Sequence, residues 1–233
     1  MSAVTERRAD NRAGGVRGLL QPRRETFESV FGVVYRSLMV GVGVGIGALP
    51  LAAAIVLVAE PLASWPFLLL CSLPLGPAFA AGCWSFQRSR DAADAAPLRE
   101  VGIGFLRTWR PALAVWSLVC ALTFVVVIDI VAVWGTPFAM LLGPLLVVVL
   151  LLAVVAAFGV FAGLAAAPGL RFRAQLLGGL VRTVRRPGTS LLSLVLLAAW
   201  AVIVLAQPVL GLLALGGFVL YAVWSNAAAA LAD

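Results

Sequence analysis

The residue types that carry most enzyme chemistry are missing or isolated in this chain. It contains no histidine and no lysine, which excludes serine–histidine catalysis, histidine metal sites and lysine Schiff bases. Asp129 is the only acidic residue well inside a long apolar run. A carboxylate in hydrocarbon is costly, so Asp129 is a candidate pathway acid for transport or proton coupling. Because it lies five residues before Trp134, at the end of the run, contact with lipid headgroups is the simpler alternative.

A second candidate feature is the pair of prolines in the middle of an apolar run, in the sequence Leu73-Pro-Leu-Gly-Pro77. Each proline removes a backbone amide and clashes with the carbonyl four residues earlier. In lipid, a carbonyl freed in this way needs a partner from a neighbouring helix or from water. Pro74, Gly76 and Pro77 therefore predict a helix break, which either lines a cavity or hinge or forms a packed kink.

No cofactor or metal site is expected. The three cysteines, Cys71, Cys83 and Cys120, lie singly in apolar runs, and no CxxC pair is present. No Walker motif occurs, and one carboxylate within the apolar runs is too few for a two-aspartate membrane protease. We therefore predict that the protein is not an enzyme.

The positions of these residues depend on whether the surrounding chain lies in lipid or in water. Hydrophobic residues make up 63% of its 233 residues, and the mean hydropathy of +1.08 requires lipid as the solvent. All 17 basic residues are arginines, confined to Arg7–Arg36, Arg88–Arg110 and Arg171–Arg186. Arginine stays on the cytoplasmic side of membrane proteins. The net charge of +7 therefore predicts contact with anionic lipid headgroups rather than with nucleic acid.

Run lengths predict an all-α, polytopic membrane helix bundle, because about 20 apolar residues cross the hydrocarbon. Six spans are expected, at residues 37–59, 66–86, 112–134, 138–166, 190–206 and 209–230. Residues 1–26 form a basic cytoplasmic tail, and residues 27–233 form a single transmembrane domain. An even number of spans, with arginines only in alternate connections, places both termini in the cytoplasm. Four tryptophans lie near span ends, where headgroups favour their rings: Trp65, Trp84, Trp109 and Trp134.

The two longer connections are predicted to be amphipathic helices lying on the cytoplasmic surface. In the first, Leu98, Val101, Phe105 and Trp109 share one side, away from most arginines. In the second, the apolar face consists of Leu176, Leu177, Leu180, Val181 and Val184. The candidate lipid or partner contacts are Arg107, Arg110, Arg182 and Arg185. The two segments share a Gly-x-x-Arg-Thr pattern, which either an internal duplication or convergence explains.

Glycines at helical spacing predict close packing of two spans within the monomer. Gly41, Gly43, Gly45 and Gly47 make overlapping small-xxx-small pairs, and Gly159 with Gly163 makes another. Small residues let helix backbones approach each other closely.

The stretch from Leu68 to Leu113 carries a family resemblance. It contains Leu73-Pro-Leu-Gly-Pro-Ala78 and, further on, Gly104-Phe-Leu-Arg-Thr-Trp-Arg-Pro111. In these features the chain resembles the YesL-like family of bacterial integral membrane proteins, a domain of unknown function. The resemblance implies a bacterial cytoplasmic-membrane protein that is accessory to carbohydrate uptake, with transporter subunits as partners.

Two other functions are open on the residues alone. A stand-alone small-solute carrier or channel would use Asp129 and the Pro74–Pro77 break. A membrane-shaping or sensory scaffold would use the two basic helices. The sequence leaves the oligomeric state open.

Overall fold

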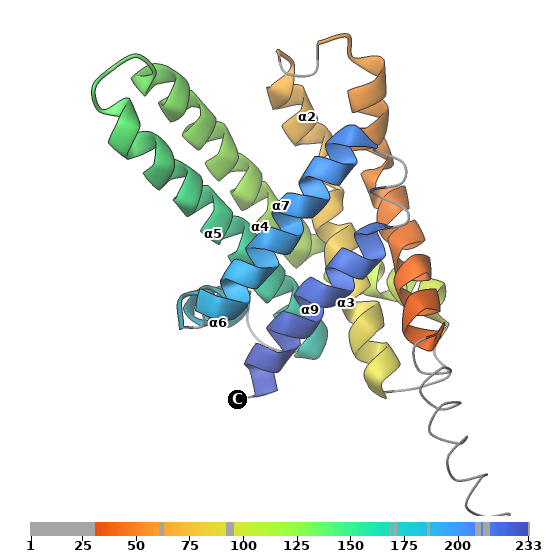
Figure 1. Ribbon diagram of the computed structural model, residues 1–233. Coiled ribbons are helices and arrows are strands. Elements are labelled where there is room, and N and C mark those ends of the chain that lie inside the picture. The colour runs from red at the N-terminus through yellow and green to blue at the C-terminus, as the bar shows by residue number, and fades with distance from the viewer. Residues whose placement is uncertain are drawn as a thin grey trace, which may run out of the picture. The chain divides into compact units, whose positions relative to one another are not determined.

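The computed structural model describes residues 31–60, 63–91, 96–167, 169, 172–185, 187–207, 211 and 215–232 (Figure 1). The chain divides into two compact units, Met1–Arg36 and Ser37–Asp233. In the first unit, the described residues 31–36 are helical. The predicted basic tail, residues 1–26, lies outside the described residues.

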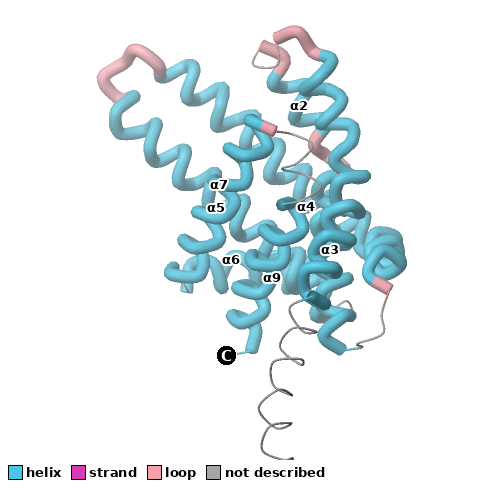
Figure 2. Tube along the Cα trace, turned by 45° about the vertical axis from the view of Figure 1, so that its right-hand side comes forward, coloured by secondary structure: helices cyan, strands magenta, loops and turns pink. Residues whose placement is uncertain are grey.

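The described residues form α-helices and no strand, and short loops join most of them (Figure 2). The helices after the N-terminal one are α2 (Trp65–Cys71), α3 (Leu75–Asp91), α4 (Pro97–Val133), α5 (Ala139–Ala166), α6 (Phe172–Arg185), α7 (Pro187–Ala206) and α9 (Gly216–Ala232). Within this part, four stretches are long and apolar enough to cross a membrane: Phe31–Leu57, Trp65–Arg90, Pro97–Val133 and Ala139–Ala166. Gly188–Val204 is apolar but shorter. The chain therefore carries several long apolar helices, as a multi-pass membrane protein does.

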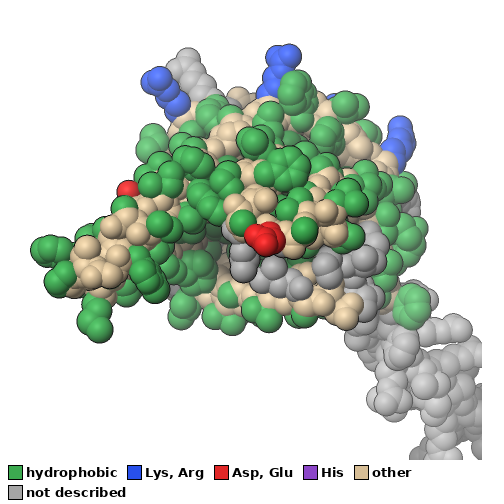
Figure 3. Space-filling model, turned by 90° about the horizontal axis from the view of Figure 1, so that it is seen from above, with side chains coloured by type: hydrophobic (Ala, Val, Ile, Leu, Met, Phe, Trp, Pro, Cys, Tyr) green, Lys and Arg blue, Asp and Glu red, His purple; other side chains and the backbone are tan. Residues whose placement is uncertain are grey.

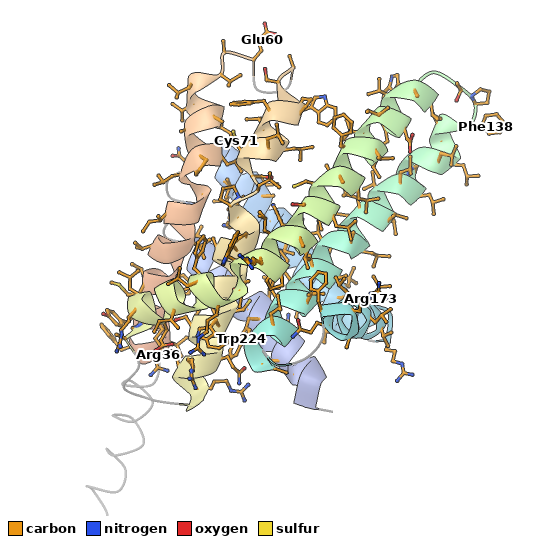
Figure 4. All side chains as sticks on the ribbon, turned by 180° about the vertical axis from the view of Figure 1, so that it is seen from behind. Arg36, Glu60, Cys71, Phe138, Arg173 and Trp224 are labelled. Atoms are coloured by element: carbon orange, nitrogen blue, oxygen red, sulfur yellow. The ribbon has the colours of Figure 1, made fainter. Side chains whose placement is uncertain are left out.

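The third predicted span and the surface helix before it are a single helix, which corrects the sequence interpretation. α4 has 37 residues, about 55 Å at 1.5 Å per residue, whereas the hydrocarbon is about 30 Å thick. Part of α4 must therefore lie outside the hydrocarbon. Pro111 lies inside the helix. Figure 4 shows α4 changing direction between its first part and the part beside α5, as an internal proline produces.

The core of the second unit depends on close approach of helices at small residues. A Cβ added to Gly47 would lie 2.5 Å from Ala78 Cβ on α3, and one added to Gly43 would lie 2.8 Å from Val101 Cγ1 on α4. Both glycines belong to the face that the sequence predicts to pack within the monomer. Aromatic rings fill the space further in, where Phe79 contacts Trp116 and Phe158 with centroid distances of 5.6 and 5.1 Å. Such ring pairs add to the hydrophobic burial of the core.

The connections of the bundle are divided between its two ends. Glu60 and the loop before Phe138 lie at one end, and Arg173 and Trp224 lie toward the other (Figure 4). The chain leaves α3 and enters α4 at this second end, and α6 and the start of α7 lie there too (Figure 1). The described arginines of the second unit belong to these elements. We call this the arginine end of the bundle.

Candidate functional site

The helix break occupies residues 72–74, between the end of α2 and the start of α3. Pro74 lies in this turn, and Gly76 and Pro77 lie in the first turn of α3. The Ser72 amide donates to the Leu68 carbonyl at 3.0 Å, and the Leu73 amide donates to the Leu70 carbonyl at 3.2 Å. Pro77 removes no helical bond of its own, because the first amides of a helix have no partner within it.

Side chains complete the hydrogen bonding at the break. The Ser72 hydroxyl donates to the Leu69 carbonyl at 2.7 Å. From α4, the Cys120 thiol lies 3.5 Å from the same hydroxyl and donates to the Leu69 carbonyl at 3.9 Å. Gly76 lies so close to Trp116 that an added Cβ would overlap that side chain. The break is thus packed against α4, an arrangement that favours a kink over an open passage.

Asp129 lies on the second part of α4, where its side chain is exposed, as is that of Glu60. On the face of the molecule shown in Figure 3, acidic side chains lie apart from one another among apolar ones. The structure therefore does not bring an acidic pair together at this end. Among the described residues, no group of three His, Cys, Asp or Glu side chains is close enough to hold a metal ion.

A small cavity lies elsewhere, where α5, α6, α7 and α9 meet. Its volume is about 40 Å³, and it is lined by Val155, Phe158, Gly159, Gly179, Thr189, Ser190, Ser193, Val223, Asn226 and Ala227. Asn226 Nδ2 lies 3.5 Å from the Ser193 hydroxyl across the space between α9 and α7. A water molecule occupies about 10–15 Å³ of such a cavity, so there is room for a few waters. None of its lining residues belongs to the helix break.

The arginine end carries two helical segments with the same threefold division of their surface. In the basic segment of α4, residues 97–110, Val101, Gly104 and Thr108 face the bundle. Leu98, Phe105, Leu106 and Trp109 are exposed, and Arg107 and Arg110 are exposed beside them. The prediction that Val101 belongs to the exposed apolar face is therefore wrong. Val101 packs against Gly43 instead of facing outward.

Helix α6 follows this division except at Arg173, which is exposed one turn before Leu177 and so lies on the apolar side. Gln175 and Gly179 face the bundle, and the Gln175 amide donates to the Ala167 carbonyl at 2.9 Å. Leu177, Leu180 and Val181 are exposed, whereas Leu176 packs partly against the core. Arg185 is exposed. The side chains of Arg182 and Val184 lie outside the described part of α6.

Four arginines of the arginine end lie over aromatic rings. Arg88 and Arg107 both lie over Trp84, with Cζ 5.8 and 5.5 Å from the ring centroid. Arg90 lies 5.7 Å from the Trp224 ring, and Arg110 lies 5.1 Å from the ring of the adjacent Trp109. These are cation–π distances.

Sequence reasoning missed Arg88 and misjudged Trp84. Trp84 was expected among headgroups, but it is only 5% exposed and packs against Gly104. The signal for its contact with Arg88 was present, because residues four apart on a helix are neighbours. The polar residues Ser193 and Asn226 of the cavity were equally visible as interruptions of apolar runs, but not as partners.

A comparison with protein-family models matches no family. Comparisons with curated proteins and with solved structures also give no match. The resemblance to the YesL-like family stays a prediction from the residues that carry it.

Proposed function

We propose that the chain is a non-enzymatic scaffold of the bacterial cytoplasmic membrane, accessory to solute uptake rather than itself the conduit. One observation carries this proposal. Two segments at the arginine end are fixed to the bundle on one face and leave an apolar face and arginines exposed on the others. A helix with an apolar and a basic face lies in the membrane interface and binds anionic lipid.

The proposed topology has six spans, with both termini on the cytoplasmic side. α7 supplies the fifth span, since its 20 residues extend about 30 Å. α9 supplies the sixth, and the described C-terminal residues lie at the arginine end (Figure 1). The bias of arginine toward the cytoplasm then gives the orientation. Tags at either terminus should be protected from protease in intact cells, and external cleavage of either tag would overturn this topology.

The cavity and the break favour an accessory role over a carrier. The cavity has room for only a few waters, the break is packed against α4, and Asp129 is exposed. The class of solute, carbohydrate, and the transporter subunits as partners rest on the family resemblance of Leu68–Leu113. Transport proteins that move sugars need a larger polar site than this cavity offers.

A flux assay on the purified full chain tests the proposal. In proteoliposomes loaded with labelled mono- and disaccharides, we expect release no faster than from protein-free liposomes. Asp129→Asn is the matched variant, because it removes the charge and keeps the shape. Flux from the wild type that Asp129→Asn abolishes would establish the carrier and remove the accessory role.

A further inference from the structure

We propose that Arg88, Arg107 and Trp84 form a binding site for a phosphate group at the arginine end. The phosphate belongs either to the headgroup of an anionic phospholipid or to a soluble phosphate compound. This inference deepens the proposed function, because it assigns the contact with anionic lipid to particular atoms instead of to a diffuse basic surface.

Two helices bring the arginines to one ring. Arg88 follows Trp84 by four residues on α3, so the two side chains are neighbours on the helix surface. Arg107 comes from α4, and Gly104, one turn earlier, makes its approach possible. A Cβ on Gly104 would lie 2.8 Å from both Cβ and Cγ of Trp84, so only glycine lets α4 come this near. The convergence is therefore a consequence of tertiary packing between α3 and α4.

Among the described side chains, no carboxylate pairs with the two arginines of this locus. Arg88 and Arg107 are both exposed. Each guanidinium lies within 6 Å of the centroid of the same ring, and two positive charges drawn to one locus favour an anion there. The ring face holds each cation in place and lowers the entropic cost of presenting it.

Trp84 adds an unsatisfied hydrogen-bond donor. Its side chain is 5% exposed, and its indole Nε1 has no hydrogen-bond partner in the described structure. Indole nitrogen only donates, and a buried donor without a partner is costly. Because Nε1 is buried, an oxygen of a bound anion reaches it only when the side chains that cover it move.

Phosphate is the anion that fits best. Guanidinium groups bind phosphate through paired hydrogen bonds, which a lysine does not reproduce. The locus also lies between the end of an apolar helix and a segment with an exposed apolar face, which is the depth of lipid headgroups. Arg90 and Arg110 lie singly over their own rings, so they provide matched arginines outside the site.

The test measures lipid and phosphate binding to the delipidated full chain in detergent. Phosphatidylglycerol binding is titrated by native mass spectrometry in one arm, and inorganic phosphate and glycerol phosphate by tryptophan fluorescence in another. Titrations with lipid are repeated by a fluorescence readout at about 0.5 M salt, where attraction between exposed charges is largely screened. Phosphatidylcholine serves as the lipid of no net charge.

We expect Arg88→Gln and Arg107→Gln each to weaken phosphatidylglycerol binding about tenfold at high salt. Arg90→Gln and Arg110→Gln should change phosphatidylglycerol binding at high salt less than twofold. Arg107→Lys should bind better than Arg107→Gln but less well than the wild type, because lysine keeps the charge without the paired donors. Trp84→Phe, which keeps the ring and removes the donor, should weaken binding several-fold.

Two outcomes would overturn the site. Equal losses for all four glutamine variants would show a diffuse basic surface, and no difference between phosphatidylglycerol and phosphatidylcholine would show no anion recognition. Binding of soluble phosphate with the same variant pattern, but not of the lipid, would keep the site and identify the soluble source. Sugar flux in proteoliposomes would overturn the accessory role and leave these affinities unaffected, so the two proposals fail separately.

Discussion

The basic segment of α4 and helix α6 share a Gly-x-x-Arg-Thr pattern and are fixed to different helices. Gly104 lies against Trp84 of α3, whereas Gly179 lies against Val160 of α5. The segment of α4 continues through Pro111 into the apolar part of the same helix, but α6 ends at Arg185 and Pro187 begins a new helix. Arg107 of the α4 segment lies over a buried ring, whereas Gly179 of α6 lines the small cavity.

The shared pattern thus places a glycine where the helix contacts its neighbour. It does not determine which side chains surround the arginine that follows. In both segments the glycine allows close approach to the neighbouring helix, because the backbones come together only where no Cβ intervenes. What lies beside the following arginine differs, since it depends on the helix that the glycine meets. The equivalence of Gly104 and Gly179 is compatible with internal duplication and equally with convergence.

The largest expected effect comes from adding one methyl group at either anchoring glycine. A Cβ at Gly179 would lie 3.2 Å from the Ala156 carbonyl oxygen and 2.5 Å from Val160 Cγ2. Gly179→Ala and Gly104→Ala should each lower the free energy of unfolding by about 2–3 kcal/mol, because backbone or wedged ring atoms must move. Unfolding in mixed micelles measures this loss.

Gly102→Ala is the control for both glycine variants, since a Cβ at Gly102 has nothing within 4 Å. It should be neutral or stabilise by about 0.5–1 kcal/mol through helix propensity. If Gly104→Ala behaves like Gly102→Ala, the anchoring role assigned to Gly104 is wrong.

A smaller effect on stability is expected from replacing the proline that follows each segment. Pro111 is inside α4, so Pro111→Ala should straighten the helix, lift the basic segment from α3 and cost about 1 kcal/mol of stability. Pro187 is the first residue of α7, where proline costs no helical bond, so Pro187→Ala should change stability little. Spin labels at positions 99 and 129, on a background without the native cysteines, should move apart in Pro111→Ala. Unchanged label distances would show that Pro111 does not determine the bend.

The smallest effect distinguishes the arginines of the two segments by their response to salt. At low salt, Arg185→Gln should weaken phosphatidylglycerol binding about fivefold, since it removes about 1 kcal/mol of attraction to an anionic surface. Arg107→Gln should weaken it by at least the loss expected at high salt, since it removes the paired contact as well. At about 0.5 M salt the loss should vanish for Arg185→Gln and persist for Arg107→Gln. If the loss of binding vanished at high salt for both variants, Arg107 would contribute only the diffuse charge attraction expected of Arg185.

Much of the helical content follows from the sequence, because apolar runs of spanning length must satisfy their own backbone in lipid. The turn at Pro74 follows from the same reasoning, since proline has no amide to donate. The continuity of α4 through Pro111 does not follow, because a proline either ends or bends a helix and packing against α3 selects between the two. Val101 and Trp84 were expected at the surface for a similar reason: periodicity gives the sides of a helix but not which side meets a neighbour.

The sequence by itself determined the solvent of this protein, the stretches that become helices and the clustering of every positive charge, since each depends only on local composition and spacing. Tertiary structure alone decided that Arg107 lies over the same Trp84 ring as Arg88, that Cys120 completes the break at Ser72, and that Asn226 faces Ser193. These pairs join residues from different helices, and their meeting depends on which small residues let two backbones approach. That choice is made by the packing of the whole bundle, which no single run of the chain contains.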